Sequence, residues 1–399
     1  MPASQLTVTL TKGRDRPVRL GHPWIFSGAI ARWEGDAGVP GAVTVRTADG
    51  EWLASGIANR KSKLAVRVLS RRENEIVDEA LIADRLDRAV TFREQLFKSD
   101  ETTNAYRLVF SEADGLSGLI VDRYADTLSI RVGAAAWVPW LPFIRDQLIA
   151  RTGAGRVAFA VEADAVEREG LDEAAVRAAS QHVRDHARIL ESGFLYNVSI
   201  TGGQKTGFYL DQREARQRVA RYAAGREVLS AYCYTGAFEL HAARAGAKSI
   251  IGLDTSRPAL QLAQTHHELN GLKTPIEYRE TSVPVELRKF RDEGRSFDLI
   301  ILDPPRFVAT PGQLEKGMRA YKDINLLALK LLRPDGILAT FSCSGWVTSE
   351  HLRLALSWAT TDARRDVQIL ESIAQPPDHP ILTAFPEGNY LHGLIARAL

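Results

Sequence analysis

The fold is decided by the stretch REVLSAYCYTGAFELHAARAGAKSIIGLD, residues 226–254. A short apolar run, REVLSAY, is followed by GAFELHAARAG, whose apolar residues recur at helical spacing, and then by a second apolar run, SIIGLD. Short apolar strands that alternate with helices are typical of a parallel sheet covered by helices on both faces. We therefore predict an α/β fold whose ligands lie at the carboxyl ends of the strands.

The same alternation continues toward the C-terminus. A helix is predicted from Ser256 to about Asn270, with Ser256 as its N-cap, Pro258 in its first turn and Gly271 after its end. FDLIILD and GILATFS read as further strands, and the helix between them is predicted to end in the turn RPDG. From about residue 186 onward the chain thus predicts a doubly wound parallel sheet.

The first predicted strand end is the turn AYCYTGAF, residues 231–238. A dinucleotide-binding turn would show GxGxxG, but here only Gly236 is present. A ligand without a phosphate, such as S-adenosylmethionine, needs less room near the backbone. Asp254, at the end of the next strand, is placed to accept hydrogen bonds from ribose hydroxyls. On these two features alone a nicotinamide enzyme stays open.

The next strand end is LDPPRF, residues 302–307. Two consecutive prolines restrict the backbone and remove two N–H donors, which leaves carbonyl groups and the Asp303 side chain facing the ligand. A methyltransferase that holds a flat base beside a methyl donor needs such a motif. The alternative is a rigid turn that only ends a strand.

The last predicted strand end is FSCSG, residues 341–345, which holds one of the two cysteines of the chain. C5 of cytosine is a poor nucleophile, but a thiolate that adds to C6 makes C5 enamine-like and able to attack a sulfonium methyl group. Cys343 is positioned for this chemistry, although an isolated cysteine is more often a small buried apolar residue. Cys233 is interpreted as a packing residue.

The N-terminal part of the chain has a different pattern. Residues 1–75 alternate apolar and polar residues between glycines and prolines, which predicts a small β-rich domain. This segment has 12 Lys and Arg against 7 Asp and Glu, an excess that is either a solvated face or a grip on phosphates. Residues 76–185 predict a mixed α+β segment, with a helix in DEALIADRLDRAVTFREQLF and a hairpin turning at Ala125 and Asp126.

Composition bounds the function. The 399 residues include 51 basic and 49 acidic residues, so a nucleic-acid surface must be local. Two cysteines exclude a disulfide framework and a CxxC zinc site, and His182 and His186 lack the acidic motif that would make them a metal pair. We see no signal peptide and no apolar run that could cross a membrane, and therefore expect a cytoplasmic protein.

Several motifs, taken in order, resemble those of the bacterial ribosomal RNA large subunit methyltransferase I family, S-adenosylmethionine-dependent enzymes that make 5-methylcytosine in 23S rRNA. The resemblance extends over nearly the whole chain. The motifs are GHPWIFSGAI (21–30), EADGLSGLIVDRY (112–124), KTGFYLDQR (205–213), CYTGAF (233–238), LDPPRF, FSCSG and DHPILTAFPEG (378–388). The first resembles the family's N-terminal PUA domain, an RNA-binding fold, and the last resembles its C-terminal signature.

The resemblance implies roles for individual residues. Cys343 matches the nucleophile, Asp254 the ribose-binding acid and Ser282 the position where the family usually has an Asp that contacts adenine, for which Glu280 is a substitute. The donor turn is matched by Tyr234, Gly236 and Phe238, the flank of the donor site by Asp211 and Gln212, and the target-base motif by Asp303, Pro304, Pro305 and Arg306. Asp303 is also expected to be catalytic; His379, Asp211 and Asp303 are the candidates for the base that removes the C5 proton. No metal is expected.

The resemblance also implies an organisation and partners. We expect a PUA-like RNA-binding domain over 1–75, a central α+β domain over 76–185 and a Rossmann-like methyltransferase domain over 186–399. The expected cofactor is S-adenosylmethionine and the expected partner is 23S rRNA, with a homodimer left open. Two alternatives remain: a guanine N-methyltransferase, which needs no thiol, and an RNA-binding ribosome-assembly factor without catalysis. The DPP motif and Cys343 argue against the nicotinamide enzyme.

Overall fold

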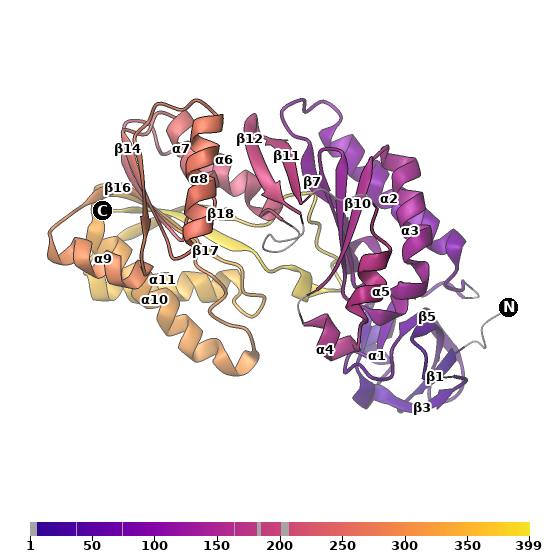
Figure 1. Ribbon diagram of the computed structural model, residues 1–399. Helices are drawn as coiled ribbons and strands as arrows, with labels where there is room; N and C mark the ends of the chain where they lie inside the picture. The colour runs from indigo at the N-terminus through magenta and orange to yellow at the C-terminus, as the bar shows by residue number, and fades with distance from the viewer. Residues whose placement is uncertain (1–5, 37, 74, 163, 182–184, 201–206) are drawn as a thin grey trace. The chain divides into compact units, whose positions relative to one another are not determined.

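The computed structural model describes residues 6–36, 38–73, 75–162, 164–181, 185–200 and 207–399 (Figure 1). The first two residues of KTGFYLDQR lie outside them. Contacts group the chain into two compact units. The first comprises Met1–Gly193, Val198–Leu210 and Asp378–Gly388, and the second comprises Phe194–Asn197, Asp211–Pro377 and Asn389–Leu399. The division into three domains at about residues 75 and 185 stays a prediction.

The N-terminal part of the first unit is a six-stranded sheet of order β2-β6-β5-β4-β1-β3. Its strands are β1 (Leu6–Leu10), β2 (Trp24–Ile25), β3 (Ile30–Glu34), β4 (Gly41–Arg46), β5 (Trp52–Ala58) and β6 (Val66–Ser70), and α1 (Arg16–Arg19) follows β1. Most pairings are antiparallel, while β1 and β4 are parallel. The predicted alternation is confirmed in β1, where every second residue is buried.

A second sheet of the first unit has the order β10-β9-β8-β7. Its strands are β7 (Ala105–Phe110), β8 (Leu119–Tyr124), β9 (Thr127–Val132) and β10 (Arg156–Val161), and its helices are α2 (Glu79–Phe97), α3 (Leu141–Thr152), α4 (Ala165–Glu169) and α5 (Glu173–Ala178). The predicted hairpin at Ala125 and Asp126 is confirmed, since Tyr124 pairs with Thr127 across it. Asp78 caps α2 by accepting a hydrogen bond from the amide of Leu81 at 2.9 Å.

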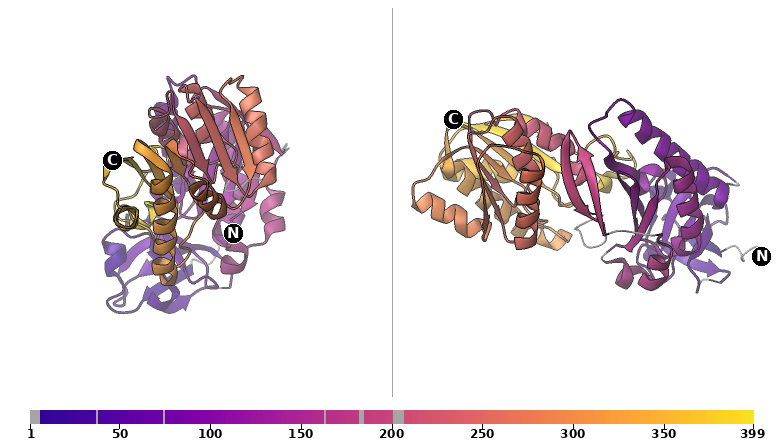
Figure 2. Two further views of the ribbon diagram at one scale, coloured as in Figure 1. Left: turned by 90° about the vertical axis from the view of Figure 1, so that its left-hand side faces the viewer. Right: turned by 45° about the horizontal axis from the view of Figure 1, so that its top comes forward.

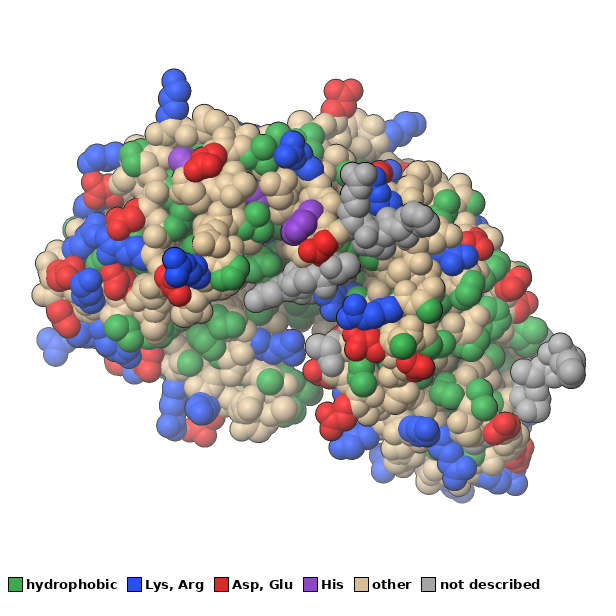
Figure 3. All heavy atoms as spheres, viewed as in Figure 1, with side chains coloured by type: hydrophobic (Ala, Val, Ile, Leu, Met, Phe, Trp, Pro, Cys, Tyr) green, Lys and Arg blue, Asp and Glu red, His purple; other side chains and the backbone are tan. Residues whose placement is uncertain are grey.

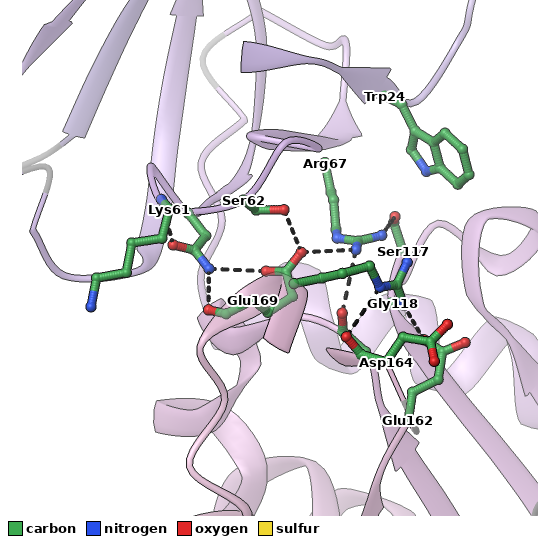
Figure 4. A network of polar contacts seen from close by, with 12 residues as sticks. Trp24, Lys61, Ser62, Arg67, Ser117, Gly118, Glu162, Asp164 and Glu169 are labelled. Atoms are coloured by element: carbon green, nitrogen blue, oxygen red, sulfur yellow. Dashed lines mark hydrogen bonds and ion pairs between the residues drawn. The ribbon is translucent and has the colours of Figure 1, made fainter. Parts of the chain in front are cut away.

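A buried polar network joins the two sheets of the first unit (Figure 4). Glu169, the last residue of α4, accepts hydrogen bonds from Ser62 at 2.7 Å and from Asn59 at 3.0 Å. The guanidinium of Arg67 on β6 lies 3.3 Å from the same carboxylate and also contacts Ser117. Since each buried charge has a charged or polar partner, this polar network fixes α4 against the six-stranded sheet.

The second unit is built on a seven-stranded sheet of order β15-β14-β13-β16-β17-β19-β18. Its strands are β13 (Glu227–Ala231), β14 (Ser249–Asp254), β15 (Ile276–Glu280), β16 (Phe297–Leu302), β17 (Leu332–Ser342), β18 (Val367–Ile373) and β19 (His392–Ala398). The pairings of β19 with β17 and with β18 are antiparallel, and all the other pairings are parallel. The predicted doubly wound sheet is therefore confirmed, and β18 and β19 extend it beyond the prediction.

Helices cover both faces of this sheet (Figure 2). The helices are α6 (Arg213–Ala220), α7 (Ala237–Arg244), α8 (Arg257–Leu269), α9 (Val283–Asp292), α10 (Leu314–Leu331) and α11 (Ser349–Ala363). Apolar residues of α9, α10 and α11 pack on one face, and those of α6 and α7 pack on the other. The predicted N-cap Ser256 is confirmed, because its hydroxyl accepts a hydrogen bond from the amide of Ala259.

The predicted turn RPDG is wrong. These four residues lie inside β17, which begins at Leu332, directly after α10. The pairing of β16 with β17 shifts register between Phe297 and Leu299, and Asp335 has a φ of 63°. The irregularity is absorbed within the strand pair, as in a β-bulge, so that the strand continues through it.

Two short strands, β11 (His186–Glu191) and β12 (Phe194–Ser199), form a hairpin where the chain passes from the first unit to the second. In the part of the chain that the structure describes, no helix is long and apolar enough to cross a membrane.

Candidate active site

The predicted site residues of the second unit gather at one edge of its sheet. Neighbouring parallel strands pair near their ends, Asp254 with Glu280 and Ala231 with both Leu253 and Leu302. The edge therefore carries, side by side, residues 231–238, Asp254, 280–283, 303–306 and 342–344, which we call the strand-end rim. The chain leaves β13 toward β14 and returns to pair β16 on its other side, and such a switch point is where α/β sheets bind ligands.

The turn after β13 has an unusual backbone. Tyr232, Tyr234 and Gly236 have φ values of 65°, 49° and 80°. Positive φ at two residues other than glycine is costly, and such backbone clusters at functional sites. A Cβ on Gly236 would lie 2.7 Å from the Tyr278 hydroxyl and 2.9 Å from the Ala263 Cβ, so only glycine fits there. The single glycine of this turn is thus required by packing as well as by conformation.

Asp254 fixes this turn to the end of β14. One carboxylate oxygen accepts a hydrogen bond from the amide of Tyr234 at 2.9 Å, and the other accepts one from the amide of Ser256 at 2.8 Å. Each oxygen of a carboxylate can accept a second bond. Asp254 can therefore position the turn and still accept hydrogen bonds from two hydroxyls of a ligand.

A buried polar group lies behind the turn. Burial raises the pKa of the Cys233 thiol well above its usual value, and the nearby Glu239 and Asp254 add to the rise. Burial also raises the pKa of Glu239 to about 7 and raises the pKa of Tyr278. The Cys233 thiol therefore stays protonated, which supports its interpretation as a packing residue rather than a nucleophile.

The turn after β16 places Asp303 and two prolines on the strand-end rim. Asp303 is half-buried and accepts a hydrogen bond from the side-chain amide of Gln212 at 3.1 Å. Pro304 is buried, whereas Pro305 and Arg306 are exposed. Next to Gln212, the carboxylate of Asp211 accepts a hydrogen bond from the Tyr390 hydroxyl at 2.7 Å. The predicted flank of the donor site is thus connected to the DPP motif through Gln212.

Cys343 follows directly after β17 and is half-buried. Its sulfur lies 3.9 Å from the carbonyl oxygen of Pro304. The two turns that carry the predicted nucleophile and the predicted base-binding motif are therefore adjacent. A thiol at this place faces the same rim as the donor turn, as attack on a bound base would require.

Tyr321 of α10 supports the backbone around Cys343, and the sequence did not single it out. It is fully buried, and its hydroxyl forms hydrogen bonds with the hydroxyls of Ser342 at 2.8 Å and Ser344 at 3.2 Å. Ser344 in turn accepts a bond from the amide of Val308. The serines on both sides of the cysteine in FSCSG are the signal that could have pointed to a buried hydroxyl donor.

Three further predicted site residues of the second unit are Phe238, Ser282 and Glu280, whose side chains are either in the core or exposed. Phe238 is near the start of α7, and its ring packs in the core at 5.4 Å from that of Phe341, so only its backbone borders the donor turn. Ser282 is the exposed N-cap of α9, without a side-chain capping bond. Glu280 is exposed and lies 4.0 Å from Arg257. Ser282 and Glu280 both sit at the end of β15, beside Asp254.

His379 and His186, two of the histidines singled out in the sequence, both belong to the first unit. His379 belongs to the first unit, where it is buried with its ring 5.4 Å from that of Phe110. His182 lies outside the described residues, and His186 is exposed beside Asp185. Among the residues that the structure describes, no three His, Cys, Asp or Glu side chains are grouped as metal ligands.

Comparisons with protein families match two parts of the chain. Residues 8–71 match the PUA-like domain family, and residues 165–385 match the family of S-adenosylmethionine-dependent methyltransferases. The predicted PUA-like N-terminal fold and the predicted methyltransferase fold are thereby confirmed.

Full-length relatives have one name in common. Proteins of Shewanella frigidimarina and Aeromonas hydrophila are 40% identical to this chain over 394 and 398 residues, and one of Cronobacter sakazakii is 38% identical over 393 residues. Each comparison covers 98% of this chain and 99% of the relative. All three are named ribosomal RNA large subunit methyltransferase I.

Solved structures share the fold over the whole chain. A protein from Streptococcus mutans, described as a SAM-dependent methyltransferase, superposes with a TM-score of 0.80 at 20% identity, covering 98% of this chain and 99% of its own. Another, described as a methyltransferase complexed with SAH, has a TM-score of 0.81 at 20% identity and covers 99% of this chain and 100% of its own.

Proposed function

Because the chain belongs to the ribosomal RNA large subunit methyltransferase I family, we propose that it methylates C5 of a cytosine in 23S rRNA through a covalent adduct between Cys343 and C6. Its cofactor is S-adenosylmethionine. The observation that carries the proposal is the position of the Cys343 thiol. It is half-buried at the end of its strand, and its sulfur lies 3.9 Å from the carbonyl oxygen of Pro304 in the DPP motif.

The strand-end rim fits this cofactor. The donor turn has no glycine-rich cradle for a pyrophosphate, and its one glycine is closed in by Tyr278 and Ala263. Asp254 would accept hydrogen bonds from the ribose hydroxyls, and Ser282 or Glu280, one strand further along, would meet the adenine. Tyr234 and Gly236 would border the cofactor, which supplies an electrophilic methyl group on a sulfonium.

Cys343 activates the cytosine ring for methylation. Its thiolate adds to C6 of the cytosine, and the electron pair of the C5–C6 double bond moves so that C5 becomes nucleophilic. C5 forms the new bond to the methyl group while the bond from that carbon to the sulfonium sulfur breaks, and the electron pair stays on the sulfur, which leaves as a thioether. A base then removes the C5 proton, the C5–C6 double bond reforms, and the bond between sulfur and C6 breaks to release the thiolate. Tyr321, Ser342 and Ser344 hold the backbone of the nucleophile.

The DPP turn would hold the target base. The carbonyl of Pro304 and the carboxylate of Asp303 are acceptors suited to the exocyclic amino group of cytosine, and Pro305 and Arg306 are exposed beside them. Asp303 is half-buried and oriented by Gln212, which makes it our candidate for the base that removes the C5 proton; Asp211 is the second. His379, a residue of the first unit, is the third candidate.

The first unit would hold the RNA. Its N-terminal part matches a PUA-like domain and carries the excess of Lys and Arg, 12 against 7 acidic residues over 1–75. On the face drawn in Figure 3, basic and acidic side chains are interspersed over both units, so the excess is one of residue number and not of a single visible patch. Deleting residues 1–75 should therefore weaken RNA binding and flatten its salt dependence, while S-adenosylmethionine binding persists.

The experiment is nucleoside analysis of 23S rRNA, from cells lacking the gene, after incubation with the protein and labelled S-adenosylmethionine. The expected product is labelled 5-methylcytidine. RNA with 5-fluorocytosine at the target should also trap the protein, since fluorine cannot leave as a cation. Labelled methylguanosine would instead show a guanine N-methyltransferase. If no RNA is methylated, a non-catalytic assembly factor is favoured.

A further inference from the structure

The first unit contains a cavity of about 860 Å³ that the proposed reaction does not use. Its walls are the end of β6, one face of α2, residues 112–115, Pro380 and Leu382. The volume lies in the range of small-molecule and nucleotide sites, about 300–1,000 Å³. The side chains that give the cavity its chemical character are Arg71, Arg72, Arg85, Arg88, Phe92 and Gln95.

The acidic groups of the cavity wall are already neutralised by other cations. Glu112 accepts hydrogen bonds from the Trp24 indole and the Ser117 hydroxyl and lies 3.6 Å from Arg67. Asp114 pairs with the buried Arg93 at 2.6 Å, and Asp87 pairs with Arg151 at 3.3 Å. None of these three carboxylates is therefore paired with an arginine of the cavity.

Two of the arginines have only carbonyl oxygens as partners. Arg71 donates to the carbonyls of Val18 and Gly21, and Arg85 donates to the carbonyl of Leu69. Within the described part of the chain, neither forms an ion pair with a carboxylate, and the Arg85 Nε is buried without a hydrogen-bond partner. Burial lowers the pKa of both guanidinium groups, and a neighbouring arginine adds to this, Arg85 for Arg71 and Arg88 for Arg85. Glu75 and Asp84 oppose the shift of Arg85 only in part. Two guanidinium groups without a direct carboxylate partner at one wall cost stability, which a bound anion would restore.

An exposed aromatic ring lies at the same cavity. Phe92 of α2 is 40% exposed, and its ring is 5.1 Å from the guanidinium carbon of Arg93. Because Arg93 is held by Asp114 and by the backbone carbonyl of Asp378, the ring rests on a fixed support. Aromatic rings next to arginines are the elements with which proteins bind unpaired nucleotides, by stacking and by contacts to phosphate.

We propose that this cavity binds single-stranded RNA, with phosphate groups at Arg71 and Arg85 and an unpaired base against Phe92. The proposal rests on the proposed function, since it assumes an RNA substrate, and it names a binding place for that RNA on residues of the first unit that the proposed reaction does not use. It also gives a role to the motif DHPILTAFPEG. Pro380 and Leu382 form part of the cavity wall, and Asp378 accepts a hydrogen bond from the amide of Arg107 at 3.0 Å, which anchors the motif there.

The test is fluorescence anisotropy of the full-length protein with a labelled 12-nucleotide oligouridylate. Arg85→Gln should weaken binding about tenfold and lower the slope of log K against log salt by about 0.7, the value for one phosphate contact on a single strand. Phe92→Ala should weaken binding about tenfold with an unchanged salt slope, because stacking is lost and no charge is removed. The melting temperature without RNA should not fall in Arg85→Gln, since a repulsion between arginines is relieved.

The matched control is Arg177→Gln. Arg177 is an exposed arginine of α5, paired with Glu173 at 2.7 Å and absent from the cavity wall. It should change the oligouridylate affinity less than twofold. Equal affinity of wild type and Arg85→Gln would overturn the inference, as would a blunt RNA duplex of the same length that binds as tightly. Displacement of the oligonucleotide by inorganic phosphate at equal phosphate concentration would point to a free anion and overturn it as well.

The two proposals fail separately. In a titration with 23S rRNA, Arg85→Gln should raise KM, because a contact to the RNA is lost. It should keep the kcat of methyl transfer at saturating RNA, because the variant changes no residue of the strand-end rim. If the protein makes no 5-methylcytidine while Arg85→Gln still loses the oligonucleotide, the proposed function fails and the cavity assignment stands. If 5-methylcytidine forms and the variant keeps full affinity and KM, the cavity assignment alone fails.

Discussion

The polar network of the first unit and the core behind the donor turn of the second unit each bury a glutamate, in opposite electrostatic surroundings. Glu169, 4% exposed, has the guanidinium of Arg67 at 3.3 Å and hydrogen bonds from Ser62 and Asn59. Glu239, 0% exposed, lies behind the donor turn, where burial raises its pKa to about 7, the charge of Asp254 adds to the rise, and Arg216 and Ser230 oppose it only in part.

The difference shows which region contributes stability and which region costs stability. A buried carboxylate with a cation and two donors forms a rigid joint, and removing either partner leaves an uncompensated charge. A buried carboxyl group without a paired cation holds its proton up to neutral pH and costs stability when it ionises. Groups with such perturbed pKa values cluster at functional sites. Variants of the polar network should therefore change stability, and variants of the strand-end rim should change binding and chemistry.

The largest effect should come from Cys343→Ala. If the thiol forms the adduct, turnover should fall by at least roughly 10⁴-fold, because no other group on the rim replaces a nucleophile. S-adenosylmethionine affinity and melting temperature should stay near those of the wild type, because the thiol is only half-buried. Initial rates with labelled cofactor and calorimetry would measure both. A variant that still makes 5-methylcytidine would contradict the proposed mechanism.

Glu169→Ala tests the other side of the comparison. Breaking a buried ion pair by removing one partner should lower the free energy of unfolding by about 3–5 kcal/mol, because Arg67 stays buried without its main carboxylate. Urea denaturation would measure the loss. S-adenosylmethionine affinity should not change in the folded variant, since Asp254 and the donor turn belong to the second unit. A loss below about 1 kcal/mol would show that the polar network is not a joint.

Glu239→Gln should remove a pH dependence of stability. The folded pKa of Glu239, about 7, lies above its usual value of 4.5, so the native state holds more protons than the unfolded state between those pH values. The free energy of unfolding should therefore decline as pH rises through this window, by up to about 3 kcal/mol from this group, and level off above it. The glutamine variant should lack this decline. Parallel curves for both proteins, from urea denaturation at pH 4.5 to 8, would contradict it.

Asp254→Ala should weaken S-adenosylmethionine binding by about 2–3 kcal/mol, roughly 30- to 150-fold, through the loss of two charge-assisted bonds to ribose. The substitution also removes the acceptors for the amides of Tyr234 and Ser256. Asp254→Asn is the matched control, because it keeps one acceptor oxygen and the shape of the side chain. Its S-adenosylmethionine affinity should lie between that of the wild type and that of Asp254→Ala. Unchanged affinity of the alanine variant in calorimetry would remove Asp254 from the cofactor site.

The smallest effect should be that of Cys233→Ala. The residue is a buried packing group against Gly252, whose added Cβ would lie 3.1 Å from its sulfur, so its truncation should cost about 1 kcal/mol of stability and leave activity measurable. The two cysteines can also be compared directly. Iodoacetamide at pH 8 should alkylate Cys343 in the native protein and Cys233 only after unfolding, because burial raises the pKa of the Cys233 thiol. Peptide mass mapping would show which cysteine is alkylated first. Equal alkylation of both cysteines in the native protein would contradict the prediction.

Local patterns in the sequence were enough to predict much of the second unit. The strand and helix periodicities around 226–254 depend on which faces of each element are buried, and they located β13, α7, β14 and α8. Because parallel strands end at the same edge of a sheet, the positions of Asp254, Asp303 and Cys343 at the ends of predicted strands also predicted that they lie on one rim.

Only the tertiary structure decided the features that depend on distant partners. Arg67 and Glu169 are 102 positions apart, and Tyr321 meets Ser342 from another element. The motif at 378–388 packs in the first unit although it follows the helices of the second. The pKa of Glu239 follows from burial on all sides, and the cavity at Arg71 and Arg85 follows from the approach of β6, α2, Pro380 and Leu382. Burial and charge pairing between remote segments have no local periodicity, so no stretch of sequence announces them.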